Sequence, residues 1–194
     1  MSKRQQQRES TRNLIISKAK DLFLSRGYLV VSTDQIAQAS GVAKGTIFHH
    51  FSNKSELGLA VIQMVNQEYS EILNQLREKY SDDDEFLFLT IKKLLQLGIE
   101  STGLVPFILQ FLTDIEMNSD FMEMIVGPYN DIFQKIFIKK GYDNSEVQLN
   151  LFFSLIDGVG LQLYLLKPEK DDPIIDYYAN VILSKFTGRE LGDK

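Results

Sequence analysis

The stretch STDQIAQASGVAKGTIFHHFSNKSEL, residues 32–57, decides how the N-terminal part of this chain folds. Ser32, followed by glutamine three positions later, forms the pattern of a capping box that begins a short helix. Gly41 ends that helix and leads through a tight turn into a second short helix, predicted for residues 44–51. Two short helices joined by a glycine turn, behind a longer amphipathic helix predicted for residues 10–26, form a helix-turn-helix. This motif places its second helix in the major groove of DNA.

The rest of the chain is also predicted to be helical, because no alternation of period two lasts long enough for a strand. The fold class is therefore all-α, with about nine helices in an N-terminal three-helix domain and a C-terminal helical ligand-binding and dimerisation domain. We predict a DNA-binding domain over residues 1–53, with residues 1–8 as a flexible arm, and a second domain over residues 54–194. Its helices are predicted at 53–80 (the connecting helix), 83–100, 119–140, 145–166 and 173–186, with a further helix that has Pro106 near its first turn and ends near residue 118.

The charge of the chain is divided unevenly along its length. Residues 1–56 contain nine Lys and Arg against four Asp and Glu, whereas residues 57–194 contain twelve against twenty-two. A local basic patch is sufficient to neutralise phosphates. The basic charge of residues 1–56 therefore favours DNA binding, although the whole chain has a net charge of −5. The chain has no cysteine, no uninterrupted apolar run of the ~18 residues that span a bilayer and no secretory signal, which predicts a cytoplasmic protein.

The motif GVAKGTIFHHFSNKSEL, residues 41–57, closely resembles the signature of the tetracycline-repressor (TetR) family, and the resemblance extends over residues 10–60. It implies a homodimer that binds a palindromic or near-palindromic DNA operator and is released when a small molecule binds the second domain. Thr33 resembles the family's phosphate contact at the start of the first short helix. Lys54 resembles the phosphate-binding lysine that opens the connecting helix.

The recognition helix supplies the other residues that the resemblance assigns to DNA. Lys44, Gly45 and Thr46 resemble its entry, with Lys44 and Thr46 available to bases or phosphate. Phe48 stands where the family commonly has tyrosine; it keeps an apolar contact, such as one with a thymine methyl group, and lacks the hydroxyl. His49 and His50 resemble the family's pair that faces a base edge and the backbone.

Aromatic and methionine side chains are dense between residues 107 and 137, a composition that builds either a solid core or an adaptable apolar pocket. A hydrophobic or aromatic effector would suit such a pocket, and a cationic one could pair with Glu100, Asp114 or Glu116. The candidate pocket residues are Phe107, Phe111, Met117, Phe121, Met124, Tyr129 and Phe133.

The predicted helix at 145–166 resembles the dimerisation helix of the family. Its glycines allow two helices to approach closely, so it would pack with the last helix against the two-fold mates. The candidate interface residues are Phe153, Asp157, Gly160, Leu161 and Tyr164.

Three other functions compete with a repressor. A transcriptional activator has the same sequence features, and so does a nucleoid-type DNA-binding module. An enzyme is disfavoured because the sequence has no phosphate loop, catalytic triad or metal-ligand cluster. No cofactor or metal is expected, since the two histidines are adjacent on a helix and point about 100° apart.

Overall fold

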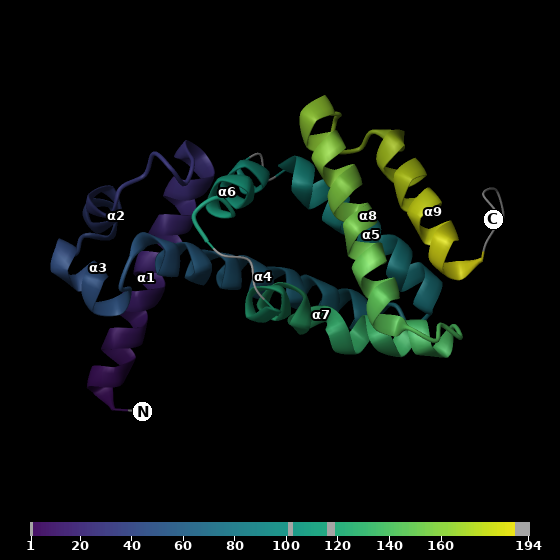
Figure 1. The fold of residues 1–194 in the computed structure, drawn as a ribbon, viewed down its shortest axis with the longest axis horizontal. Helices are drawn as coiled ribbons and strands as arrows, with labels where there is room; N and C mark the ends of the chain where they lie inside the picture. Colours follow the sequence, from purple (N-terminus) through teal and green to yellow (C-terminus); the bar gives the residue numbers. More distant parts are fainter. Residues whose placement is uncertain (1, 101–102, 116–118, 189–194) are drawn as a thin grey trace. The chain divides into compact units, whose positions relative to one another are not determined.

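The computed structural model describes residues 2–100, 103–115 and 119–188, without the side chains of residues 119–126, 128 and 129. Within these residues the chain forms nine α-helices and no strand (Figure 1), which confirms the predicted all-α class. The helices are α1 (Lys3–Arg26), α2 (Thr33–Ser40), α3 (Lys44–His50), α4 (Lys54–Lys79), α5 (Asp83–Glu100), α6 (Leu104–Phe111), α7 (Ser119–Lys139), α8 (Ser145–Leu166) and α9 (Pro173–Thr187).

The chain divides into two compact units. The first comprises Met1–Gln67 and Gly103–Ile125, and the second comprises Glu68–Thr102 and Val126–Lys194. The predicted boundary between residues 53 and 54 falls inside the first unit. The first half of α4 and the whole of α6 thus belong to the same unit as the helix-turn-helix.

The core of the first unit joins α1, α2 and α3 through one face of each helix. Ile15 and Phe23 of α1 are fully buried, as is Ile36 of α2. Ile47 of α3 and Phe51 immediately after it are 1% exposed. These apolar residues recur at helical spacing, and their burial fixes which face of α3 remains outside.

α1 begins seven residues before the predicted start at residue 10, so the expectation of a flexible arm over residues 1–8 is wrong for residues 3–8. Ser2 caps the helix in a full capping box: its hydroxyl accepts from the N–H of Gln5 at 3.3 Å, and Gln5 Oε1 accepts from the N–H of Ser2 at 2.8 Å. The residues that follow are mainly Gln and Arg, which favour helices. Local capping and propensity therefore extend α1 although residues 2–10 are all exposed.

α6 is shorter than predicted, ending at Phe111 instead of near residue 118. The hydroxyl of Thr113 donates to the carbonyl of Gln110 at 2.7 Å, and the N–H of Asp114 donates to the carbonyl of Phe111 at 2.9 Å. These local bonds close a turn and replace the hydrogen bonds that would continue the helix.

In the second unit α5 packs against both α8 and α9 (Figure 1). Its core is rich in phenylalanine, including Phe86, Phe133, Phe137 and Phe152, each fully buried. α8 is long and apolar enough, by length and composition, to cross a membrane, although only 22% of its most apolar stretch is buried within the single chain. Core helices of soluble proteins pass the same criterion, but they are mostly buried, whereas α8 is not buried over most of this stretch in the single chain.

Candidate nucleic-acid interface

The turn between α2 and α3 has the geometry that the sequence predicts. Ser32 and Gln35 form the expected capping box at the start of α2. Gly41 adopts φ +65°, a left-handed conformation that residues with a Cβ rarely adopt, and so it ends α2 sharply. The N–H of Val42 then donates to the carbonyl of Ala37 at 3.1 Å. Ala43 offers α3 no side-chain cap, so the first N–H groups of α3 are left for other partners.

The residues of α3 that the sequence assigns to DNA lie on its outer surface. Ile47, which was not assigned to DNA, is the one buried residue of α3, and it anchors the helix on the core. Phe48 is 47% exposed, which is unusual for a phenylalanine unless a partner covers it. The exposed or half-exposed residues of α3 are Lys44, Gly45, Thr46, Phe48, His49 and His50.

Lys44 is held in place by an acid that the sequence analysis did not single out. Its ammonium group lies 2.9 Å from the carboxylate of Asp34 in α2. The two side chains are 53% and 62% exposed, and such a solvated ion pair contributes at most about 1 kcal/mol. A phosphate could therefore replace Asp34 at small cost. The pair orients Lys44 at the entry of α3 until DNA arrives.

Lys54 has a more buried environment at the start of α4. Its ammonium lies 4.3 Å from the centre of the Tyr28 ring and donates to the carbonyl of Leu29 at 3.4 Å. Burial lowers the pKa of Lys54, although the charge of Asp114 opposes this effect. Thr33, the other predicted phosphate contact, is half-exposed at the first position of α2.

The two histidines differ in their surroundings. Their rings lie 5.4 Å apart in an edge-on arrangement. Burial, followed by the charges of His49, Arg8 and Arg12, lowers the pKa of His50, which keeps this ring neutral near pH 7. A neutral imidazole can accept a hydrogen bond from a base as well as donate one.

A hydrogen-bonded junction, made of Tyr28, Ser55, Gln110 and Asp114, ties the end of α6 to the DNA-binding helices. The hydroxyls of Tyr28 and Ser55 both donate to the same carboxylate oxygen of Asp114. These bonds, first that from Tyr28, lower the pKa of Asp114, while burial and the bond to Asp114 raise the pKa of Tyr28. The amide oxygen of Gln110 accepts from the N–H of Leu29 at 3.1 Å.

The sequence analysis missed this junction because its partners are distant in sequence. Asp114 lies 86 residues from Tyr28 and 59 from Ser55. No periodicity or motif links such positions, and only the packing of α6 beside α1 brings them together.

The candidate pocket residues with described side chains belong to the cores of the two separate units. Phe107 and Phe111 are fully buried in the first unit, where their rings lie 5.5 Å from Phe23 and 5.4 Å from Tyr28 respectively. Phe133 is fully buried in the second unit, 5.3 Å from the ring of Phe152. These three residues are core in the described structure. Met117 lies outside the described residues, as do the side chains of Phe121, Met124 and Tyr129.

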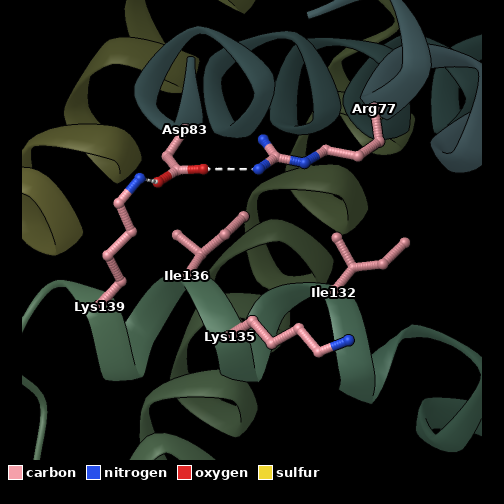
Figure 2. Close-up of a pocket in the computed structure, with 6 residues that line it drawn as sticks. All are labelled: Arg77, Asp83, Ile132, Lys135, Ile136 and Lys139. Atoms are coloured by element: carbon pink, nitrogen blue, oxygen red, sulfur yellow. Dashed lines mark hydrogen bonds and ion pairs between the residues drawn. The ribbon is translucent and has the colours of Figure 1, made fainter. Parts of the chain in front are cut away.

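A pocket of about 280 Å³ is present in the second unit, and it is not aromatic (Figure 2). Asp83 of α5 lies there between Arg77 of α4, at 2.8 Å, and Lys139 of α7, and it forms an ion pair with each of them. Arg77, Asp83 and Lys139 thus form an ion-pair bridge between the three helices, and the side chain of Asp83 at its centre is 9% exposed. Ile132, Lys135 and Ile136 complete the lining.

The acids predicted to pair with a cationic effector are engaged with the protein itself. Glu100 forms an ion pair with Lys170, and Asp114 belongs to the junction with Tyr28 and Ser55. Glu116 lies outside the described residues. Neither described acid is left facing an empty apolar space.

The candidate interface residues of α8 are divided between core and surface. Phe153 packs its ring 5.3 Å from Phe133 and is partly buried against the core. Leu161 is 40% exposed, Asp157 is exposed, and Gly160 and Tyr164 are half-exposed. A more continuous exposed apolar row, which we call the α8 outer face, comprises Val147, Leu151, Leu155, Leu161 and Leu165.

The compact helix-turn-helix with an exposed, partly basic recognition helix defines this chain as a DNA-binding protein. Residues 15–61 match the profile of the family described as bacterial regulatory proteins, tetR family. This match covers the helix-turn-helix part of the chain and, with the curated relatives, supports a TetR-family helix-turn-helix transcriptional regulator, as the sequence motif predicted.

Three known proteins illustrate the relationship. An HTH-type transcriptional regulator of Staphylococcus aureus is 25% identical over 170 residues, which cover 86% of each chain. The HTH-type transcriptional activator FasR of Mycolicibacterium smegmatis is 41% identical over 56 residues, 29% of this chain and 26% of FasR. The transcriptional regulator FadR of Bacillus subtilis, solved in complex with stearoyl-CoA, has the same fold, with a TM-score of 0.71, 21% identity, and coverage of 91% of this chain and 98% of FadR.

Proposed function

We propose that this chain is a cytoplasmic repressor that binds a two-fold symmetric DNA operator as a homodimer and leaves it when an apolar small molecule binds. The observation that carries the proposal is the outer surface of α3, where Lys44, Thr46, Phe48 and His49 are presented by a helix anchored through Ile47. Lys44, with Lys54 and Thr33, suits phosphates, whereas Thr46 and His49 suit base edges.

Dimerisation is supported by the α8 outer face. Its leucines and valine are 40–69% exposed in the single chain, and exposed apolar rows of this kind mark interaction surfaces. Gly158 follows Val147 by eleven residues and Leu151 by seven, so it lies on the same face of the helix. Glycine at the centre of such a face lets a second helix approach closely. A second copy of α8 suits this surface because a two-fold interface brings together the same patch of both subunits, so that one apolar face covers the other.

Effector release is supported by the junction at Tyr28, Ser55 and Asp114. The end of α6 is hydrogen-bonded both to the loop before α2 and to the start of α4. A ligand that displaces α6 or α4 would therefore move the recognition helix, and an operator requires two recognition helices about 34–36 Å apart. The complex of FadR with stearoyl-CoA favours an apolar effector over a cationic one, as does the engagement of Glu100 and Asp114.

An activator is the second candidate, because FasR, whose helix-turn-helix segment is 41% identical, is an activator. A nucleoid-type module would bind many unrelated sequences, and nothing in the relatives supports catalysis.

The test begins with DNA selected from a random-sequence duplex library by the wild-type chain. A repressor should select one palindromic sequence and bind it far more tightly than unrelated duplex, and a promoter containing that sequence should become more active when the gene is deleted. Loss of promoter activity on deletion would identify an activator, and a library without enriched sequence would indicate a nucleoid-type module. An inducer from a thermal-shift screen should bind free protein more tightly than the operator complex, because coupling is reciprocal. Equal affinities would refute effector release.

A further inference from the structure

The N-terminal turns of α1 carry a row of three cations, of which only the innermost packs against the described part of the fold. Arg4, Arg8 and Arg12 stand four residues apart, so they lie on one side of the helix. The row continues along α1 into Ile15, Ala19 and Phe23, which face the core. The same face of α1 is therefore apolar where it packs on the core and cationic in the N-terminal turns, which extend beyond the core.

The inner end of this row lies beside the recognition helix. The guanidinium of Arg12 is 5.0 Å from the centre of the Phe51 ring, directly after α3. Arg8 and Arg12 both act electrostatically on His50, the last residue of α3. The arginine row therefore begins next to the surface proposed to enter the major groove.

The row has no carboxylate partner among the described residues. Lys3, Arg4 and Arg8 form no ion pair there, and Glu9 is the only acid among residues 2–12. Like charges four residues apart destabilise a helix, by about 0.2–0.5 kcal/mol per pair. The Ser2 capping box nevertheless keeps these residues helical. A helical row of like charges whose outer members, Arg4 and Arg8, are exposed suits an anionic partner outside the chain.

We propose that Arg4 and Arg8 bind the phosphate backbone of DNA beside the groove that α3 enters, with Arg12 fixing the helix against Phe51. This inference rests on the proposed function. These phosphate contacts would fix the position of the protein on the DNA and would carry no information about the base sequence. At 1.5 Å per residue, Arg4 lies about 12 Å along the helix axis from Arg12, so the contacts would fall outside the bases read by α3.

The test uses the full chain and the selected operator, with binding measured across a range of salt concentrations. The double variant Arg4→Gln/Arg8→Gln removes two charges while keeping good helix formers. Arg26→Gln, at the opposite end of α1 and equally exposed, is the matched control. The double variant should reduce the slope of log K against log salt concentration by about 3.6, since it removes two phosphate contacts from each protomer of the proposed dimer and each contact contributes about 0.9.

Three further results separate the alternatives. Affinities for operator and for unrelated duplex should fall by a similar factor, so that the ratio between them is kept. Arg4→Lys/Arg8→Lys should keep the wild-type slope because lysine retains the charge. An unchanged slope in the double variant, or an equal decrease in Arg26→Gln, would overturn the inference. In either case wild-type binding to the operator would still support the proposed function, whereas its absence would refute that function itself.

Discussion

The packing of α6 in the first unit makes Gly58→Ala the most quantitative test of the structure. Gly58 is in α4, and a Cβ at this position would lie 2.6 Å from Cε2 of Phe111 and 3.1 Å from Cε2 of Tyr28. Both rings are fully buried, with centroids 5.4 Å apart, so neither has room to turn away. To reach an ordinary contact of 3.4 Å, Phe111 and the helix that carries it must move by about 0.8 Å.

The expected cost can be estimated by comparison with a glycine that has free space. Gly98→Ala, in α5, is the matched control, because no atom lies within 4 Å of its Cβ position. Both substitutions should stabilise their helix by about 0.5–1 kcal/mol. Only Gly58→Ala also overpacks a core, which costs about 1–3 kcal/mol.

The assay is thermal unfolding of both variants at one protein concentration, because the midpoint of a dimer depends on concentration. One kcal/mol corresponds to about 2–4 °C for a chain of this size, so Gly58→Ala should melt about 2–12 °C below Gly98→Ala. Equal midpoints would show that Phe111 does not pack against α4 as described.

Three further predictions follow from the ion-pair bridge, the α8 outer face and the recognition helix. Burial raises the pKa of Asp83, but the bonds from Lys139 and Arg77 outweigh it and lower the pKa below its ordinary value, so the unfolded chain binds the proton more tightly. The stabilisation from Asp83 is thus complete above about pH 4 and is lost as the pH falls through the lowered pKa. Asp83→Asn should therefore reduce the free energy of unfolding, measured in urea, by about 1.5–3 kcal/mol at pH 7 and by less at pH 3. A Cβ added at Gly158 meets no atom within 4 Å in the single chain, so for Gly158→Leu sedimentation should detect monomer with an intact fold, and a normal dimer would place the interface elsewhere. Thr46→Ala should change the selected sequence and cost about 1–3 kcal/mol of operator affinity, whereas an equal loss on unrelated duplex would make Thr46 a phosphate contact.

Local patterns were sufficient for the helix-turn-helix. Capping at Ser32 and the glycine that ends α2 at position 41 are each determined within a few residues, and the structure confirms both. The same kind of signal was overlooked at Ser2, where a capping box with Gln5 extends α1 through the predicted arm.

The role of the α6 phenylalanines could not be decided from the sequence. Its phenylalanines were assigned to a candidate effector pocket because aromatic density suits a pocket and a core equally well. The structure instead packs Phe107 and Phe111 against Phe23 and Tyr28. Composition records how much apolar surface must be buried, and only the packing decides which other residues bury it.

The sequence by itself determined the all-α class, most of the helices and the helix-turn-helix, because capping, helical periodicity and turn glycines act over one or two turns of chain. Tertiary structure alone decided the Tyr28–Asp114–Ser55 junction, the Arg77–Asp83–Lys139 bridge and the α8 outer face. The residues of the junction lie up to 86 positions apart, and those of the bridge up to 62. Contacts at such separations depend on how helices pack in three dimensions, and no short-range pattern in the chain encodes them.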